Sequence, residues 1–181
     1  MPASSDHRVV LFRAADTLPI LEIINEAAVA YRGVIPNDRW HDPYMSSDEL
    51  RRDIERGVSF VGLSVGERLV GVMGVQRVRD CDLIRHAYVL PSFQRHGIGG
   101  SLLRHLTAGT TRRILVGTWA NATWAVSFYQ RHGFTLADPV QSKLLLGAYW
   151  EIPPAQMEAS VVLLRAATGE TSMNPRHTGP V

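Results

Sequence analysis

The sequence predicts a single domain of the α/β (α+β) class, in which strands and helices are mixed along the chain. Two apolar stretches, residues 58–65 and 68–78, flank Gly66-Glu67, and a glycine first in a two-residue connection favours a type II′ hairpin of antiparallel strands. Further along, the chain reads as strand, glycine-rich loop, helix and strand. With 181 residues, of which 45% are hydrophobic, it can build one core.

An opening strand and a first amphipathic helix are predicted before residue 32. The apolar run within residues 8–13 favours the strand. Asp16 or Thr17 can cap the helix that follows. The apolar side chains of this helix recur at helical spacing, at Leu21, Ile24, Ala28 and Tyr31.

Residues 32–46 mix prolines, aromatic and charged side chains without a period, as expected of a loop. Ser46 or Ser47 can then cap a short charged helix that ends at Arg56. This loop is unusually aromatic for a plain connection.

Three further strands are predicted, at residues 82–89, 113–119 and 160–164. The first of them ends before Pro91, because proline cannot donate a hydrogen bond to a sheet.

Helices are predicted between these strands. One begins after the glycine-rich loop, with Ile98, Leu102 and Leu106 on one face. Another covers residues 122–132, with Asn121 as its N-cap and Gly133 as the residue that ends it. Residues 143–150 are expected to form one or two helical turns.

The folded domain is expected to span residues 8–165. It follows an N-terminal segment of residues 1–7. Residues 166–181 are polar and contain glycine and proline, so they are expected to form a disordered tail.

Charge and cysteine content narrow the function classes. The net charge is +2, and the basic residues are arginines spread along the chain apart from Lys143, so no patch for nucleic acid or membrane is expected. Cys81 is the only cysteine, which excludes an intrachain disulfide and fits a reducing compartment. We find no export signal or anchor and expect a cytoplasmic protein.

The glycine-rich loop carries the strongest chemical signal. Glycines at 97, 99 and 100 remove side chains where a strand turns into a helix, and this exposes backbone N–H groups at the positive end of that helix. Such a turn can hold a diphosphate. A P-loop would need Gly-Lys-Ser/Thr, and a dinucleotide fingerprint would need glycine where Leu102 stands, so both are excluded.

Two sequence blocks resemble the GNAT superfamily of acetyl-CoA-dependent N-acetyltransferases. The spacing Gln94-x-x-Gly97-x-Gly99, directly after Tyr-Val-Leu-Pro, is similar to the family's pyrophosphate loop. The segment Tyr129-x-x-x-Gly133-Phe134 resembles the block on the helix after the family's fifth strand. The resemblance covers roughly residues 8–165.

The resemblance implies a fold and a co-substrate. The fold is a mixed, mostly antiparallel twisted sheet of about six to seven strands, splayed between strands four and five, with helices on both faces. The co-substrate is acetyl-CoA. The residues expected to bind it are Val89, Gln94, Arg95, His96, Gly97, Ile98, Gly99, Gly100 and Ser101.

The resemblance also implies direct attack of an amine on the thioester in a ternary complex. The backbone N–H of Val89 would then stabilise the oxyanion, and Tyr129 would protonate the leaving thiolate. Tyr129 can alternatively be a core aromatic of an amphipathic helix.

The base is less clearly indicated. Many family members have a glutamate on the fourth strand, where this chain has Leu83. His86 on the same strand can act as the base, or can be a hydrogen-bonded core histidine. Cys81 is expected to be a bystander.

Acceptor binding is predicted in the aromatic loop, at Arg39, Trp40, His41 and Tyr44. The same loop can instead pack on its own domain or on a second subunit, so the chain is expected to be a monomer or a homodimer. No metal-ligand spacing is found among the seven histidines.

Three functions remain open at this point. The first is transfer of an acetyl group to a primary amine of a small molecule or peptide. The second is an acyl-CoA-binding module without efficient turnover, and the third is an interaction protein that uses the loop aromatics.

Overall fold

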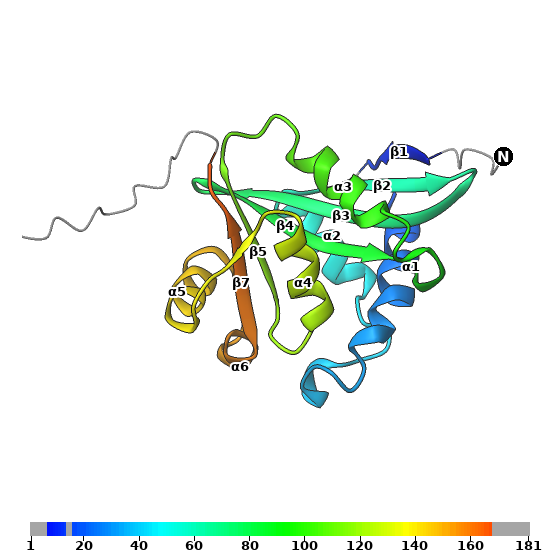
Figure 1. Cartoon of the computed structure of the whole chain (residues 1–181). Coiled ribbons are helices and arrows are strands. Elements are labelled where there is room, and N and C mark those ends of the chain that lie inside the picture. Colours follow the sequence, from blue (N-terminus) through cyan, green and yellow to red (C-terminus); the bar gives the residue numbers. More distant parts are fainter. Residues whose placement is uncertain (1–6, 14–15, 168–181) are drawn as a thin grey trace, which may run out of the picture.

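The computed structural model describes residues 7–13 and 16–167. Its sheet has seven strands in the order β1-β2-β3-β4-β5-β7-β6, with α3 and α4 in front of it and α2 behind it in Figure 1. The strands are β1 (His7–Leu11), β2 (Val58–Val65), β3 (Arg68–Val78), β4 (Cys81–Val89), β5 (Arg113–Trp119), β6 (Thr135–Leu136) and β7 (Ser160–Arg165). The helices are α1 (Thr17–Ala28), α2 (Ser47–Glu55), α3 (Ile98–Thr107), α4 (Thr123–Arg131), α5 (Pro139–Tyr149) and α6 (Pro154–Glu158).

The hairpin between β2 and β3 is confirmed. Both strands have the predicted bounds and pair in antiparallel fashion. Gly66 has a φ of +60°, whereas Glu67 is not among the residues with positive φ. A positive φ at the first central residue alone is the type II′ pattern.

Strands β4 and β5 pair in parallel, whereas each pairs in antiparallel fashion with its other neighbour in the sheet. Residues Cys81–Ile84 pair in parallel with Arg113–Val116, and beyond these four pairs the two strands are no longer bonded to each other. The mixed sheet that splays between its fourth and fifth strands, as predicted, is therefore confirmed. The splay leaves an opening between the last residues of β4 and β5.

A bulge in β4 lies beside this opening. Val72 of β3 pairs with Tyr88 and Gly74 pairs with Arg85, so β4 has an extra residue between these pairs. His86 lies in the bulge and has a φ of +48°. Positive φ is uncommon for residues other than glycine, although histidine is among those that adopt it more often.

The caps of the first two helices differ. Asp16 precedes α1, but its carboxylate accepts a hydrogen bond from the Arg13 N–H at 2.9 Å and caps no N–H of the helix. The expectation that Asp16 caps the helix through its side chain is therefore wrong. The cap of α2 is confirmed, because Ser46 and Glu49 form a reciprocal capping box.

Two expectations in the second half of the chain are corrected. Asn121 does not cap α4: the helix begins one residue later, with Ala122 at the cap position, and the Asn121 amide donates to the Val34 carbonyl at 3.5 Å. Helix α5 is longer than predicted, because Asp138 caps it by accepting from the Gln141 N–H at 2.8 Å. Gly133, with a φ of +82°, ends α4 as expected.

The core lies on both faces of the sheet. Helix α1 buries Ile20 and Ile24 against β3 and β4, whereas α3 packs Leu102 over Gly71 of β3 from the front of the sheet in Figure 1. Leu146 of α5 packs against Leu83 and the buried parts of β5 and β7 in a separate cluster. Burial on both faces explains why the central strands are almost continuously apolar.

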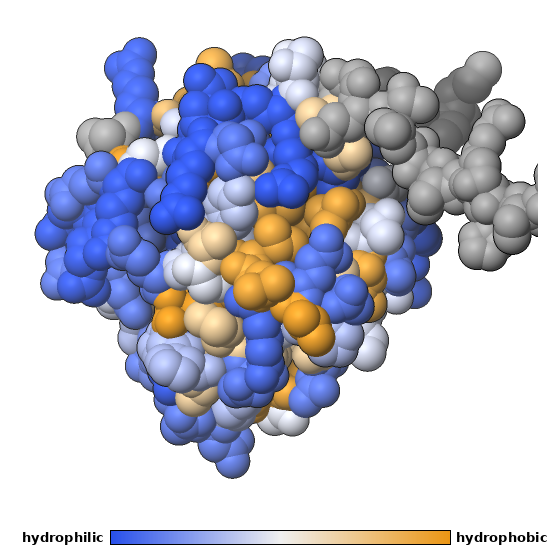
Figure 2. Space-filling model, turned by 90° about the vertical axis from the view of Figure 1, so that its left-hand side faces the viewer, coloured by the Kyte–Doolittle hydropathy of each residue, from blue (hydrophilic) through white to orange (hydrophobic). Residues whose placement is uncertain are grey.

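Apolar side chains also reach the surface on the side of α5. Leu136, Val140 and Leu144 are exposed on β6 and α5, and Figure 2, which views this side, shows apolar surface gathered across it. Within the described ranges, no helix has the length and apolar character needed to cross a bilayer. The predicted tail lies outside the described residues apart from 166 and 167, as does the predicted N-terminal segment apart from His7.

Candidate active site

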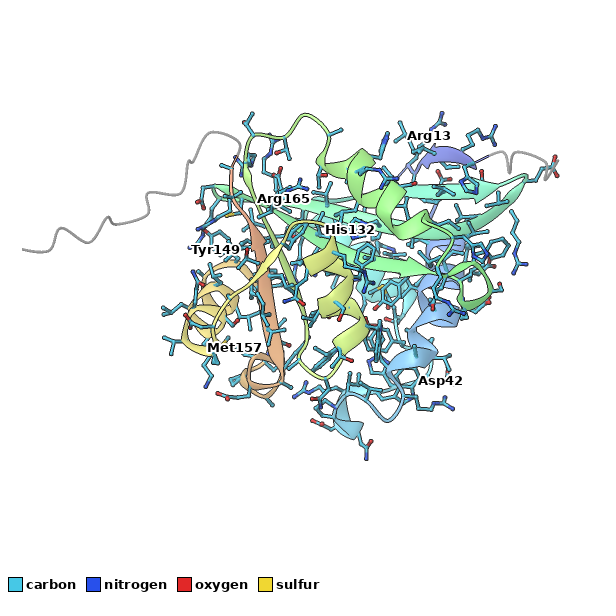
Figure 3. All side chains as sticks on the ribbon, viewed as in Figure 1. Arg13, Asp42, His132, Tyr149, Met157 and Arg165 are labelled. Carbon is cyan, nitrogen blue, oxygen red and sulfur yellow. The ribbon has the colours of Figure 1, made fainter. Side chains whose placement is uncertain are left out.

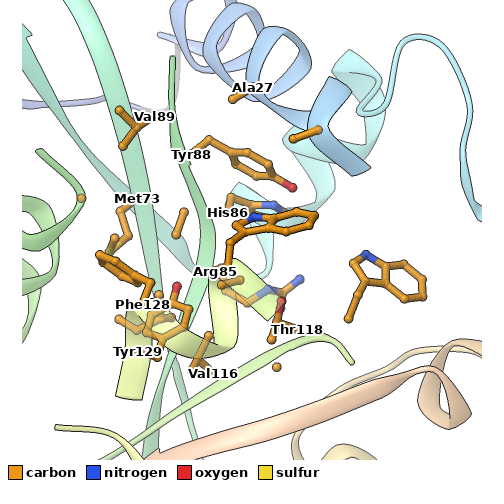
Figure 4. A pocket seen from close by; sticks show the side chains of 18 of the residues that line it. Ala27, Met73, Arg85, His86, Tyr88, Val89, Val116, Thr118, Phe128 and Tyr129 are labelled. Atoms are coloured by element: carbon orange, nitrogen blue, oxygen red, sulfur yellow. The ribbon is translucent and has the colours of Figure 1, made fainter. Parts of the chain in front are cut away.

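The main cavity occupies the opening between β4 and β5. It has a volume of about 580 Å³ and is lined by the end of β4, the glycine-rich loop, β5, α4 and the end of α1. Figure 4 shows His86, Tyr88 and Val89 from β4 around this cavity together with Tyr129 from α4. A cavity of this size is typical of small-molecule sites.

The glycine-rich loop forms one end of the cavity. Gly97 adopts the left-handed conformation at φ +79° directly before α3, and the Ser101 N–H donates to the Gly97 carbonyl at 2.9 Å as the first bond of that helix. The N–H groups of Ile98, Gly99 and Gly100 therefore precede the bonded turns. The side chain of Gln94 donates to the Val89 carbonyl at 3.1 Å, which ties the loop to β4.

Gly99 and Gly100 also let α3 approach α4. A Cβ atom on Gly100 would lie 2.7 Å from Nε2 of His132, and one on Gly99 would lie 3.3 Å from the Phe128 ring. A side chain at Gly100 would require the His132 ring to shift. Glycine is thus required here both by the exposed N–H groups and by packing.

Arginine side chains surround this end of the cavity. Arg95, Arg104 and Arg131 line it together with the helix N-terminus, and His132 lies beside them. Nδ1 of His132 donates to the Phe128 carbonyl, 2.8 Å away, and the ring lies where α4 meets α3 (Figure 3). Only Arg95 was expected in the site. Arg104 and Arg131 were missed because arginines are frequent along the whole chain.

Val89 directs its N–H into the cavity. The next residue, Leu90, donates its N–H to Val70 of β3 at 2.9 Å. Neighbouring residues of a strand direct their N–H groups to opposite sides, so the Val89 N–H points away from β3 and toward the opening. A donor at this position faces any carbonyl bound between β4 and β5.

Tyr129 lies in the wall of the cavity formed by α4. It is buried, and its ring packs edge-on against Phe128 and Phe134, at centroid distances of 5.0 and 5.5 Å. Burial raises the pKa of the Tyr129 hydroxyl well above its ordinary value, so the hydroxyl stays protonated at neutral pH. Tyr129 is thus a core aromatic whose side chain also lines the cavity.

His86 is paired with a carboxylate that the sequence did not single out. Nε2 of His86 lies 2.7 Å from Oδ2 of Asp53 on α2, and both side chains are largely buried. The His86 ring also stacks on Phe60, with centroids 5.7 Å apart. This leaves Nδ1 as the nitrogen without a hydrogen bond among the described residues.

Asp53 carries a negative charge at neutral pH. Burial alone would raise the pKa of Asp53, but the hydrogen bond from His86 and the charges of His86, Arg85 and Arg56 lower it below its ordinary value. Its ionised carboxylate can therefore accept the Nε2 proton of His86 in a hydrogen bond. By contrast, Leu83 is fully buried against α5 and does not reach the cavity.

A second cavity opens on the other side of His86. It also has a volume of about 580 Å³ and lies between α2 and the loop of residues 32–46. Arg39, His41 and Tyr44 line it, whereas Trp40 lines neither cavity and instead packs with Ile35 and Trp119. The two cavities share one wall, made of Tyr44, His86, Tyr88, Trp119 and Gln156.

Tyrosine rings dominate the region where the two cavities meet. Tyr31 lies 6.0 Å from Tyr44 and 6.3 Å from Tyr88, measured between ring centroids. Burial and the neighbouring Tyr44 raise the pKa of Tyr31 to about 12, although a hydrogen bond from Thr118 acts in the opposite direction. Burial also raises the pKa of Tyr88. These hydroxyls are uncharged at neutral pH.

Within the described ranges, the single cysteine lies outside the main cavity and no metal-binding cluster is found. Cys81 is buried beside Arg113 at the far end of β4, with Nε of Arg113 3.3 Å from its sulfur. No group of three potential metal ligands was found in the part of the chain that is described.

The family model of the acetyltransferase (GNAT) domain matches residues 23–144. The match includes α2, the β4–β5 opening, the glycine-rich loop and α4. The chain therefore belongs to the GNAT family of acetyltransferases, whose co-substrate is acetyl-CoA. The family and the co-substrate predicted from the sequence are confirmed.

Solved structures agree with this fold. The PaiA N-acetyltransferase from Thermoplasma acidophilum, in complex with coenzyme A, is 15% identical with a TM-score of 0.65, and the alignment covers 88% of this chain and 98% of that one. A GNAT family acetyltransferase from Elizabethkingia anophelis with acetyl-CoA bound is 17% identical with a TM-score of 0.59, covering 88% and 97%.

A third similar structure is the ribosomal-protein-S18-alanine N-acetyltransferase from Escherichia coli. It is 15% identical with a TM-score of 0.59, and the alignment covers 93% of this chain and 97% of that one. A comparison with curated protein sequences found no match. At these identities the structures support the fold and leave the acceptor open.

Proposed function

We propose that this chain transfers an acetyl group from acetyl-CoA to a primary amine of a small molecule or peptide, by direct attack in a ternary complex. The observation that carries the proposal is the cavity between the splayed ends of β4 and β5, which runs from the N-terminus of α3 to His86. This single cavity contains both the N-terminus of α3, which can bind an anion, and His86, which is hydrogen-bonded to Asp53.

The glycine-rich loop would bind the diphosphate of the co-substrate. The free N–H groups at the start of α3 supply donors, and the helix dipole favours negative charge there. Arg95, Arg104 and Arg131 add positive charge around the same point. Acetyl-CoA bound with its diphosphate here would extend its thioester along β4 toward His86.

Two donors would stabilise the reaction. The Val89 N–H, directed into the opening, would donate to the oxyanion that forms when the amine attacks the thioester carbonyl. The carbon–sulfur bond then breaks, and Tyr129 would give its proton to the leaving thiolate. Burial raises the pKa of Tyr129, so this proton is present at neutral pH.

His86 would remove the proton from the amine, directly or through water. A free alkylamine has a pKa of about 10 and must lose a proton before it attacks. Asp53 acts as a positioning residue, because its carboxylate holds Nε2 of His86 and leaves Nδ1 as the basic nitrogen.

The test is calorimetric titration of acetyl-CoA, followed by measurement of thiol release over a panel of amines. Gly97→Asp should weaken binding by at least about ten-fold, because the carboxylate repels the diphosphate. Asn and Asp both tolerate the left-handed conformation, so Gly97→Asn controls for the backbone. Gly109→Asp, at a glycine with the same φ of +79° in another turn, controls for added charge.

Binding of acetyl-CoA without thiol release for any amine would favour the acyl-CoA-binding module instead of the enzyme. Absence of acetyl-CoA binding in the wild type would contradict the proposal altogether and leave the interaction protein as the alternative.

A further inference from the structure

The second cavity has the position of an acceptor site, because it reaches the main cavity at His86. Its walls come from α2, from residues 38–45 and from the shared side chains. Three residues of α2 and Arg56, which directly follows the helix, line the cavity. Arg52 and Asp53 each lie three or four residues from Glu49 and from Arg56, as on one face of a helix. The polar face of α2 therefore faces a cavity.

The carboxylates of this cavity already have partners. Oε2 of Glu49 accepts from the backbone and the hydroxyl of Ser46, at 2.8 and 2.7 Å. Oδ2 of Asp53 is held by His86 at 2.7 Å and faces Arg85 at 3.6 Å. The acidic groups are thus used to position the chain itself.

Two guanidinium groups keep donors that the described residues do not use. Arg52 forms no side-chain hydrogen bond or ion pair of 4.0 Å or less within the described ranges, although its charge helps to lower the pKa of Glu49. Arg39 forms an ion pair with the exposed Asp38, 3.3 Å from its Nε, but this buried Nε has no hydrogen-bond partner among the described residues. A buried N–H without a partner is costly unless a ligand satisfies it.

We propose that this cavity binds an acceptor whose molecule carries a carboxylate as well as the reactive amine, such as an amino acid or a peptide with an acidic group. Arg52 binds the carboxylate, and Arg39 supplies a second donor. The planar guanidinium matches a carboxylate in shape and charge. A dianionic phosphate fits less well, because Asp38, Glu49 and Asp53 line the same cavity. This inference rests on the proposed acetyl transfer, because it places the amine at His86.

The experiment compares amines that differ only in one carboxylate. The pairs are γ-aminobutyrate and its amide, glutamate and glutamine, and the dipeptides Ala-Glu and Ala-Gln. Each is tested for thiol release with acetyl-CoA, and for binding by calorimetry in the presence of coenzyme A. We expect a preference for the charged member of at least one pair of roughly 10- to 100-fold, as for a charged hydrogen bond.

Arg52→Gln should remove this preference while leaving acetyl-CoA binding unchanged. Arg51→Gln is the matched control: Arg51 is the neighbouring arginine on α2, pairs with Asp48 at 3.0 Å and lines neither cavity. It should keep the preference. Arg39→Gln tests the second donor and should reduce the preference less than Arg52→Gln does.

The outcomes separate this inference from the proposed function. Transfer to neutral amines with no carboxylate preference, or a preference that Arg52→Gln leaves intact, overturns the inference and leaves acetyl transfer standing. Binding of the charged amines that depends on Arg52, with no thiol release, supports the carboxylate site and overturns the proposed transfer. If no charged amine binds or reacts better than its amide, the inference is overturned.

Discussion

His86 on β4 and Asp53 on α2 form a hydrogen bond of 2.7 Å, between residues 33 positions apart in the sequence. The bulge that gives His86 its φ of +48° moves the ring out of the regular alternation of β4, and the capping box at Ser46 fixes the start of α2. The pair thus depends on two local features that are both unusual in the chain. It lies in the wall between the two cavities.

Asp53→Asn should lower kcat for amine acetylation by at least about ten-fold, because the imidazole would lose the carboxylate that orients it. The KM for acetyl-CoA should change little, since Asp53 does not line the main cavity. Steady-state kinetics with the best amine of the panel measure both constants. Asp48→Asn on the exposed side of α2 is the control, and an equal loss of kcat there would contradict a positioning role for Asp53.

The same pair makes stability depend on pH. The pKa of Asp53 is lower in the folded protein than its ordinary value, so its contribution to stability is fully present above about pH 4, the unfolded value, and is lost as the pH falls through the folded pKa. Wild type should therefore be more stable than Asp53→Asn at pH 7, with the difference shrinking toward pH 3. Urea unfolding at both values checks this, and a difference that does not change with pH would contradict it.

His86→Asn should lower kcat by roughly 10² to 10⁴, the range for loss of a general base. Asparagine is chosen because it tolerates positive φ, so the bulge can persist. Steady-state kinetics at pH 7 with the best amine of the panel measure the loss. A kcat equal to that of wild type would mean that another group takes the amine proton.

The sequence predicted those parts of the fold that local patterns determine. The hairpin at Gly66 and the turn at Gly97 follow from glycine conformation and apolar alternation, and both lie where expected. Helix α5 was underestimated because its apolar side chains face both ways: Val140 and Leu144 are exposed, whereas Leu146 is buried. A helix without a single apolar face gives a weak periodic signal.

The site was predictable only in part. The glycine-rich loop could be found because its residues are contiguous. The Val89 N–H was expected only from the family resemblance, and its direction follows from the bond between Leu90 and Val70. The role of Asp53 could not be inferred, because a carboxylate on a short charged helix has no local feature that distinguishes it from Asp48. Only the packing of α2 against the sheet brings it to His86.

Asp82→Asn should lower the free energy of unfolding by about 2 kcal/mol, because it weakens the hydrogen bonds that fix the start of the β4–β5 pairing. The Asp82 carboxylate is buried and accepts from Nε of Arg112 at 2.9 Å and from Thr110 at 2.7 Å. Urea unfolding at pH 7 measures the change. Asp48→Asn, which alters only an exposed pair, should cost less than about 1 kcal/mol, and equal losses would argue against the network.

Tyr129→Phe should lower kcat by about 10² or more while acetyl-CoA still binds, because the ring remains in the core and only the proton donor is lost. Burial raises the pKa of Tyr129, so the wild-type hydroxyl keeps its proton at pH 9 and kcat should not fall there from ionisation of this group. Calorimetry and kinetics from pH 6 to 9 test both statements. A kcat equal to that of wild type would assign the thiolate proton to water or to another tyrosine.

Tyr149→Phe is the matched control for that prediction. Tyr149 lies on α5, away from the main cavity (Figure 3), and its hydroxyl donates to Asp80 at 2.6 Å. The hydrogen bond to Asp80, with a smaller contribution from Cys81, raises the pKa of Tyr149 to about 12. The protonated Tyr149 hydroxyl therefore contributes to stability fully below about pH 10, the unfolded pKa, and this contribution is lost as the pH rises through about 12. The variant should be less stable than wild type at pH 7 with kcat unchanged, whereas Tyr129→Phe is expected to lower kcat.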